Sequence, residues 1–348
     1  MGMSKMGNAT KRISKRYDRG ANKNGAHLVV LLTVIAMSVI PMGPLASPAL
    51  IRAEAHSYQN PKTLQERLGY PPDAKLLIVH ADDLGVSHSE DAATTKALET
   101  GSVNSGSIMV PCPWLSDIAN YARSHPEADL GLHLTLTSEW ATYRWGPVAP
   151  KDKVPSLLDP NGYLYPTETE AAAHIDPKEA EIEVRAQVEK AIAFGIKPTH
   201  LDAHMGTLFR TGPLFEALLR VAHEYKLPVL MSKNLAEATP FISSALGPSD
   251  ITIDRIITIG PSVPASGWER FYESAIKGLQ PGVTELIIHV AYDDAEMRAV
   301  TVDHPDWGAA WRQRDFDFFT SAECKKLLED NNVKLVTWRQ IGKLLHQG

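Results

Sequence analysis

Short apolar segments alternate with longer amphipathic segments along the chain from Lys75 to the C-terminus. The apolar segments have the length and residue types of buried strands, and the amphipathic ones have helical periodicity. Eight segments are expected to be strands: 76–81, 103–110, 129–136, 198–203, 228–231, 251–258, 284–290 and 333–337. Six segments are expected to be helices: 90–100, 114–124, 177–194, 213–226, 268–279 and 317–330.

This alternation predicts parallel strands that are joined by helical crossovers. About eight strands in about 270 residues suit an α/β fold of the (β/α) TIM-like barrel type, distorted or short of one strand. A doubly wound open sheet is the alternative. We therefore expect a single barrel domain over residues 75–345, preceded by a polar, proline-rich lead-in segment at 56–74.

The first 55 residues have a different pattern. A basic region is followed by an apolar run from Leu28 to about Met42, which prolines and a glycine end. Ala53-Glu54-Ala55 then offers a small-residue cleavage site, and this order predicts a secretory signal peptide. The run is short for a membrane span, which needs about 20 residues. We expect an exported protein, periplasmic or extracellular, and an uncleaved N-terminal membrane anchor is the alternative.

The charge of the chain argues against a nucleic-acid partner. Without residues 1–55, the chain has 27 Lys and Arg against 39 Asp and Glu, which is a net charge of −12. The basic surface that binds nucleic acid is therefore missing. The two cysteines, Cys112 and Cys324, are too few for a disulfide framework and are expected to be unpaired.

Two adjacent aspartates end the first predicted strand. In the stretch LLIVHADDLGVSH, Asp82 and Asp83 follow a buried apolar run and precede Gly85. Buried carboxylates are costly unless they are paired, and parallel barrels carry their working residues at the carboxyl ends of strands. At a strand end the backbone can turn, so both carboxylates can reach one site. A glycosidase carboxylate pair is a competing interpretation, but it leaves the histidines at other strand ends unexplained.

Histidines lie near the ends of three further predicted strands. In LGLHLTLTSEW the leucines share one face, and His133 lies on the other. In PTHLDAHMG, His200, Asp202 and His204 share one face, as ligands of a divalent cation would. In ELIIHVAYDDAEM, His289 is a candidate for proton transfer. A lone strand histidine is more often a hydrogen-bonded structural residue than a metal ligand or a catalytic group. Whether these side chains converge on one site therefore decides between a structural and a functional role.

Five motifs in order resemble those of the YdjC-like carbohydrate deacetylases, a family that includes chitooligosaccharide and hopanoid-biosynthesis-associated deacetylases. The motifs are IVHADDLGVS, SGSIMVPCPW, GLHLTLTSEW, PTHLDAHMG and ELIIHVAYDD, and the later WRQRDFDFF resembles the family's Arg-rich entry to its last large helix. The resemblance covers about residues 75–340. It implies a distorted (β/α) barrel and metal-dependent removal of N-acetyl groups from amino sugars.

By position, the resemblance implies that Asp83, His133 and His204 bind a divalent metal ion, Zn²⁺ or Mg²⁺. It also implies that Asp82 is the general base and that His289 is the proton donor. The expected substrate is an acetylated amino sugar or oligosaccharide. The alternatives are an exported hydrolase of a non-sugar amide or ester and a non-catalytic carbohydrate-binding barrel. Asp82 and His289 favour an enzyme, since a pure binding protein needs neither.

Substrate contacts are expected in two loops. Aromatic residues closely follow His133 and could form a wall for a sugar ring, with ordinary loop packing as the alternative. Two further residues follow His289 in the next loop. The substrate-binding candidates are therefore Trp140, Tyr143, Trp145, Tyr292 and Asp293.

Overall fold

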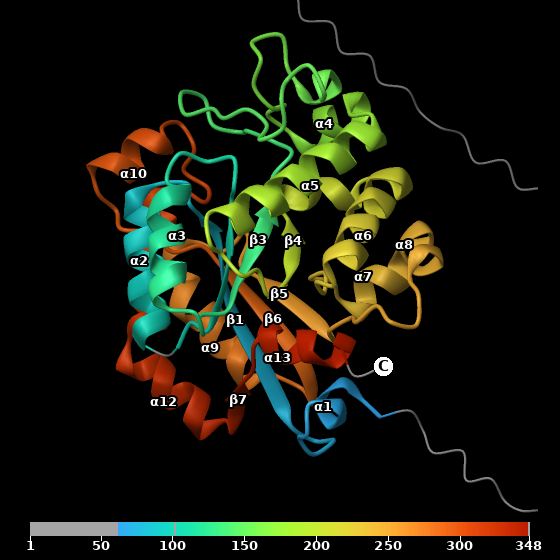
Figure 1. The fold of residues 1–348 in the computed structure, drawn as a ribbon. Coiled ribbons are helices and arrows are strands. Elements are labelled where there is room, and N and C mark those ends of the chain that lie inside the picture. The colour runs from blue at the N-terminus through green and yellow to red at the C-terminus, as the bar shows by residue number, and fades with distance from the viewer. Residues whose placement is uncertain (1–61, 101, 347–348) are drawn as a thin grey trace, which may run out of the picture. The chain divides into compact units, whose positions relative to one another are not determined.

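The computed structural model describes residues 62–100 and 102–346 (Figure 1). The predicted signal or anchor at 1–55 and the first part of the lead-in lie outside the described residues. Within the described ranges, no helix is both long and apolar enough to cross a membrane.

Seven parallel strands form one sheet. Their order is β4-β3-β2-β1-β6-β5, and β7 pairs with the first residues of β1. The long central strand β1 therefore has β6 on one side, with β7 and then β2 on the other. The strands are β1 (Lys75–Leu84), β2 (Ser105–Ile108), β3 (Leu130–Leu134), β4 (Leu201–Ala203), β5 (Arg255–Thr258), β6 (Gly282–Ile288) and β7 (Val333–Leu335).

Isolated bridges join the two edges of this sheet and curl it into a distorted barrel. Leu201 of β4 bridges Val229, and Ser232 bridges Ile253, which lies just before β5. The predicted barrel is thus confirmed, and the open doubly wound sheet is wrong. The segment 228–231 contributes one bridge instead of a strand, and its first residue, Pro228, has no N–H to donate to a ladder.

Helices cover the outside of the barrel (Figure 1). The longer ones are α2 (His88–Thr100), α3 (Leu115–Ser124), α5 (Pro177–Ala193), α6 (Gly212–Tyr225), α9 (Trp268–Lys277), α11 (Ala309–Thr320) and α12 (Ala322–Asp330). The short ones are α1 (Leu64–Arg67), α4 (Glu168–His174), α7 (Lys233–Ala238), α8 (Pro240–Ala245), α10 (Ala295–Val300) and α13 (Trp338–Gly342).

The single helix expected at 317–330 is wrong, because two helices meet at Ser321. The Ser321 hydroxyl accepts a hydrogen bond from the Cys324 backbone N–H at 3.0 Å and so caps the start of α12. A serine cap of this kind satisfies a helix N-terminus and favours a break in the helical run.

Side chains of β1 alternate between two environments, as the period of a strand requires. Leu77, Val79 and Ala81 pack with residues of the outer helices α9, α11 and α12. Leu76 and Ile78 belong to a different apolar cluster, which includes Trp338 and Ile253. The positions that continue this inner series, 80 and 82, are a histidine and an aspartate. The barrel interior is therefore apolar at its base and becomes polar toward the carboxyl ends of the strands.

Candidate metal and catalytic site

The end of β1 is irregular, and this brings both aspartates to one site. The pairing register between β1 and β2 shifts between Ala81 and Leu84. Asp83 has a φ of 70°, in the left-handed region that non-glycine residues seldom adopt. Such a conformation costs about 1–3 kcal/mol and is concentrated at functional sites. In a regular strand the two carboxylates would diverge, so the expectation that the backbone turns here is confirmed.

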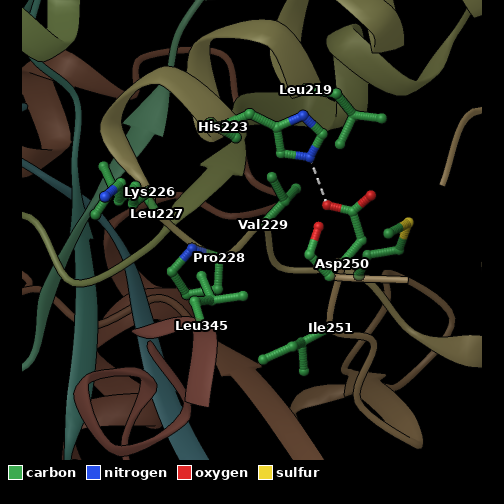
Figure 2. A pocket seen from close by; sticks show the side chains of 12 residues that line it. Leu219, His223, Lys226, Leu227, Pro228, Val229, Asp250, Ile251 and Leu345 are labelled. Carbon is green, nitrogen blue, oxygen red and sulfur yellow. Dashed lines mark hydrogen bonds and ion pairs between the residues drawn. The ribbon is translucent and has the colours of Figure 1, made fainter. Parts of the chain in front are cut away.

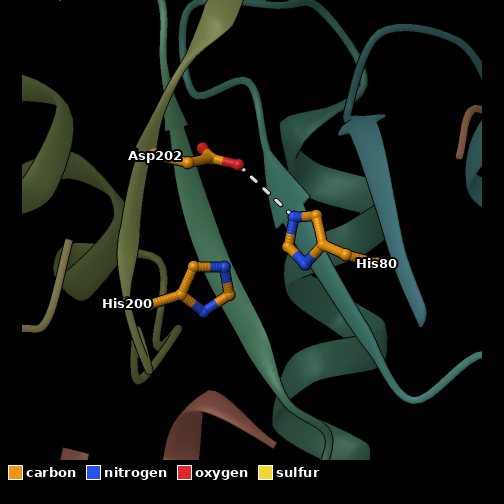
Figure 3. A group of neighbouring side chains, drawn as sticks. All are labelled: His80, His200 and Asp202. Atoms are coloured by element: carbon orange, nitrogen blue, oxygen red, sulfur yellow. Dashed lines mark ion pairs between the residues drawn. The ribbon is translucent and has the colours of Figure 1, made fainter. Parts of the chain in front are cut away.

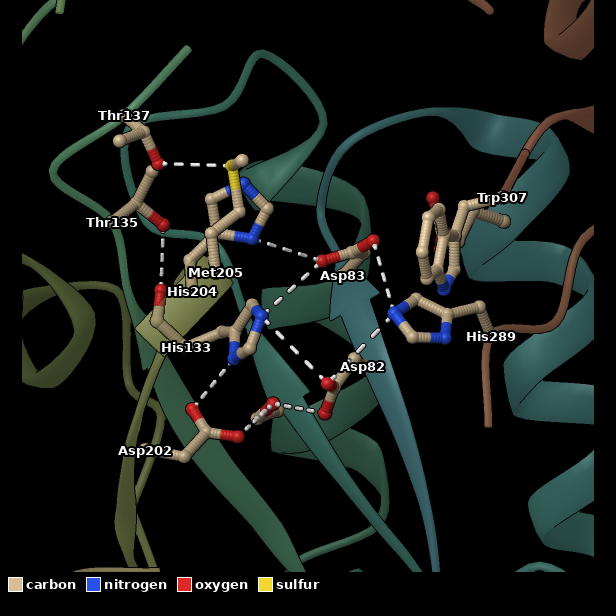
Figure 4. Close-up of polar contacts among 12 residues, drawn as sticks. Asp82, Asp83, His133, Thr135, Thr137, Asp202, His204, Met205, His289 and Trp307 are labelled. Carbon is tan, nitrogen blue, oxygen red and sulfur yellow. Dashed lines mark hydrogen bonds and ion pairs between the residues drawn. The ribbon is translucent and has the colours of Figure 1, made fainter. Parts of the chain in front are cut away.

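Asp83, His133 and His204 come together at the carboxyl ends of β1, β3 and β4 (Figure 4). Asp83 Oδ1 lies 3.3 Å from His133 Nε2 and 3.4 Å from His204 Nδ1. The three ligand atoms lie within 4.8 Å of one another, and all three residues are buried. Within the part of the chain that the structure describes, Asp83 Oδ1 has no hydrogen-bond partner, which is costly for a buried carboxylate oxygen.

Two further carboxylates orient the two imidazoles. Asp202 Oδ1 accepts a hydrogen bond from His133 Nδ1 at 2.7 Å, and Glu139 Oε2 lies 3.0 Å from His204 Nε2. The other nitrogen of each ring is thereby left facing Asp83. Histidines that bind metals in proteins are usually held in this way through their second nitrogen. The unpartnered oxygen, the two oriented imidazoles and the carboxylates behind them fit a divalent cation.

Arg312 of α11 fixes the other oxygen of Asp83. Its guanidinium donates to Asp83 Oδ2 at 2.8 Å, pairs with Glu90 of α2, and donates from Nε to the Trp307 carbonyl at 2.6 Å. Burial alone would raise the pKa of Asp83, but the Arg312 guanidinium and the neighbouring imidazoles of His133 and His204 outweigh it and hold that pKa well below its usual range. Asp83 is therefore a carboxylate with one oxygen fixed by Arg312 and one free.

Asp82 and His289 lie beside this cluster. His289 Nε2 is 3.9 Å from Asp82 Oδ2 and 3.9 Å from Asp83 Oδ2. The backbone N–H of His289 donates to Asp315 at 3.0 Å, which fixes the end of β6. Burial lowers the pKa of His289 to about 4, so its imidazole is neutral near pH 7. Its side chain is 15% exposed, against 9% for Asp82 and 4% for Asp83, so it is the most open of the three.

The aromatic residues after His133 do not form an open wall. The indoles of Trp140 and Trp145 are buried, and Trp145 Nε1 donates to the Thr137 carbonyl at 2.8 Å. The half-buried Tyr143 donates its hydroxyl to the Val86 carbonyl at 2.7 Å. These contacts anchor the loop above the site. A substrate contact by any of the three rings stays a prediction.

The two candidates after β6 have partners of their own. The Tyr292 ring packs edge-on against Phe316 at 4.9 Å between centroids, and it borders a groove between α2 and α3. Asp293 pairs with Arg298 at 2.6 Å. Their predicted roles in substrate binding stay predictions.

His200 lies apart from the Asp83 group. It clusters with His80 and Asp202 in the barrel interior (Figure 3). The three polar residues after Pro198 that share a strand face thus divide between two sites, because Asp202 orients His133 while His204 faces Asp83.

Sequence reasoning did not identify three charged residues of the site. Arg312 lies in the quoted WRQRDFDFF stretch, but nothing in a single sequence indicates which arginine points inward. Glu139 follows His133 by six positions, and Glu90 lies in the first turn of α2. Each acts through a partner from a distant segment, which only the fold brings close.

A separate hollow of about 340 Å³ lies between α6 and residues 249–251 (Figure 2). Its lining is mostly apolar, and its charged pair is His223 with Asp250, 2.6 Å apart. The His223 side chain is about half exposed, and among residues 62–100 and 102–346 no further ligand group converges on this pair. The strand-end cluster is therefore the better candidate for chemistry.

The sequence matches the family described as YdjC-like protein over residues 76–330. It is similar to a carbohydrate deacetylase of Thermus thermophilus, with 31% identity over 81% of this chain and 99% of the relative. A carbohydrate deacetylase of Thermoanaerobacter pseudethanolicus is 25% identical over 76% of this chain and 98% of the relative. The structure is also similar to a crystal structure from Enterococcus faecalis V583, which is named as a cellobiose-phosphate cleavage protein. The match covers 77% of this chain and 99% of that chain, with a TM-score of 0.65 and 23% sequence identity. The two chains therefore share the same fold.

Proposed function

Because this chain belongs to the YdjC-like family, we propose that it is a metal-dependent hydrolase that removes N-acetyl groups from acetylated amino sugars or their oligosaccharides. The observation that carries the proposal is the convergence of Asp83, His133 and His204 around an unpartnered carboxylate oxygen. Relatives that cover most of this chain are named carbohydrate deacetylases, which supports the substrate class.

We propose that Asp83, His133 and His204 hold the metal. One carboxylate and two imidazoles favour Zn²⁺ over Mg²⁺, since Mg²⁺ is usually bound by oxygen ligands. A divalent cation in this position would polarise the acetyl carbonyl and lower the pKa of water. Arg312 keeps Asp83 ionised for this role, and Asp202 and Glu139 keep the imidazoles oriented.

The remaining groups move protons. We assign Asp82 as the general base that takes a proton from the attacking water, because its carboxylate lies beside the cluster without the arginine that fixes Asp83. Attack on the acetyl carbon and cleavage of the C–N bond give acetate and a free amine. His289 is placed to deliver a proton to that amine, which is otherwise a poor leaving group. Since the imidazole is neutral near pH 7, it must first receive the proton that it passes on.

The test is acetate release from N-acetylated chitooligosaccharides by the purified protein. Activity should disappear after chelation and return with Zn²⁺. Release that survives complete metal removal would contradict the metal role. Metal-dependent hydrolysis of simple esters or amides without any release from acetylated sugars would support the non-sugar hydrolase instead. Sugar binding without release of acetate would support a non-catalytic barrel.

A further inference from the structure

A second polar layer lies in the barrel interior next to the proposed site. It contains His80, His200 and Asp202, all buried, and Figure 3 shows their side chains facing one another. Glu285 of β6 joins this layer, with its Oε1 3.4 Å from His80 Nδ1. The mechanism above uses Asp202 but gives no role to His80, although a fully buried imidazole among three carboxylates requires an explanation.

His80 has polar partners at both ring nitrogens. Nε2 lies 3.1 Å from Asp82 Oδ1 and 3.3 Å from Asp202 Oδ2. Nε2 is also 3.1 Å from the Ser107 hydroxyl, and Nδ1 is 3.0 Å from the Ser105 hydroxyl. An imidazole that carries protons on both nitrogens presents one N–H donor to the acceptors on each side of the ring. A proton thus accounts for the His80 contacts without a second metal ion.

The charges around His80 favour that doubly protonated ring. Burial alone would lower the pKa of His80, but Glu285, Asp202 and Asp82 outweigh it and raise the pKa well above its usual range. Burial and the neighbouring His80 outweigh Asp202 at the nearby His200 and hold its pKa well below its usual range. The Nδ1 of His200 is 3.0 Å from the Thr199 hydroxyl, and its Nε2 has no hydrogen-bond partner among the described residues. The positive charge of this layer therefore lies on His80.

The two oxygens of Asp82 face different layers. Oδ1 faces His80, while Oδ2 is 3.8 Å from His133 Nε2 and 3.9 Å from His289 Nε2. His80 thus fixes Oδ1 from the barrel interior, and Oδ2 is left facing the proposed metal site and His289. A base held in this way is already in its reactive orientation, so less entropy is lost in reaching the transition state.

We propose that His80 is a positioning residue that holds the carboxylate of Asp82, so that Asp82 Oδ2 faces the attacking water. This inference rests on the proposed function, because it needs Asp82 to act as the base. It differs from the role of Asp202, which orients the metal-site histidine His133. His80 should therefore affect the chemical step without affecting how much metal the protein holds.

The experiment compares His80→Gln and His80→Leu with the unchanged protein. We expect kcat to fall about 10- to 100-fold in His80→Leu, with a smaller fall in His80→Gln, which keeps a neutral donor. The KM and the bound metal should stay unchanged in both. His200→Gln is the matched control, since His200 is equally buried in the same layer but has no hydrogen bond to Asp82. Its kcat should stay within a few-fold of the unchanged protein.

A double-mutant cycle with Asp82→Asn separates positioning from a structural role. If His80 acts through Asp82, His80→Gln should cost nothing further once Asp82 is an asparagine. An equal further loss in that background would overturn the inference, and so would a loss of metal in the single His80 variants. An unchanged kcat in both His80 variants would overturn it as well. An unchanged protein that releases no acetate from any acetylated sugar would instead overturn the proposed function, and with it the base that His80 holds.

Discussion

Replacing Arg312 with methionine should destabilise the metal-free protein strongly. Arg312 is 2% exposed and is the partner of two buried carboxylates, Asp83 and Glu90. Removing one partner from a buried ion pair typically costs about 3–5 kcal/mol, because the remaining charge is left uncompensated. Two carboxylates share this arginine, so we expect a loss of stability in the upper part of that range. The hydrogen bond to the Trp307 carbonyl would be lost as well.

The assay is urea unfolding in the presence of a chelator, with the unfolded fraction measured by circular dichroism. Arg298→Met is the matched control, because it breaks an ion pair whose arginine is mostly exposed, and it should change stability little. Glu90→Gln in the Arg312→Met background should restore part of the loss, with a coupling free energy of about 1–3 kcal/mol. A loss below about 1 kcal/mol for Arg312→Met, or strict additivity with Glu90→Gln, would refute the reasoning that one arginine compensates both carboxylates.

Three further predictions concern the rest of the chain. Burial raises the pKa of Glu183 from 4.5 to about 7, so the stability that this group contributes is full below pH 4.5 and is lost as the pH rises through 7. In the unchanged protein this group should lower the free energy of unfolding by about 3 kcal/mol as the pH rises from 4.5 to 7. Glu183→Gln should remove that decline in urea unfolding measured as a function of pH, and an unchanged pH profile would contradict the prediction. Gly131→Ala should cost about 1–3 kcal/mol in the same assay, since its Cβ would lie 2.4 Å from the His200 ring; a neutral effect would show that the ring moves freely. Export predicts a mature N-terminus near His56 by mass spectrometry of material from the native host, and an intact N-terminus on soluble cytoplasmic protein would contradict it.

The strands and their order along the chain were largely predictable, because local signals determine them. The apolar run before Asp82 predicted β1, and the amphipathic segment at 177–194 predicted α5. The predicted strand at 228–231 was wrong because only tertiary pairing decides how many ladder bonds an extended segment makes. The break at Ser321 was missed because a serine inside an amphipathic pattern is compatible with either a helix interior or a cap.

The site was predictable to the extent that strand alternation determines which side chains face inward. Period-two alternation placed His133 opposite its leucine neighbours, and Asp83, His133 and His204 do come together. The second partners were not predictable, since Arg312 is more than 200 positions from Asp83 in the sequence. Nor did alternation show that the residues sharing a face in PTHLDAHMG serve two layers, because that depends on the depth of each residue in the barrel.

Metal content measured beside acetate release, in Asp82→Asn and Asp83→Asn, tests the central claim most directly. We expect Asp83→Asn to lose the metal and the activity together, because a neutral amide is a poorer cation ligand than a carboxylate. Asp82→Asn should keep the full metal content while its rate falls about 10²–10⁴-fold, which is the usual worth of a general base. Equal metal loss in both variants would show that both carboxylates are ligands. Full metal with near-normal turnover in Asp82→Asn would contradict the assignment of the base.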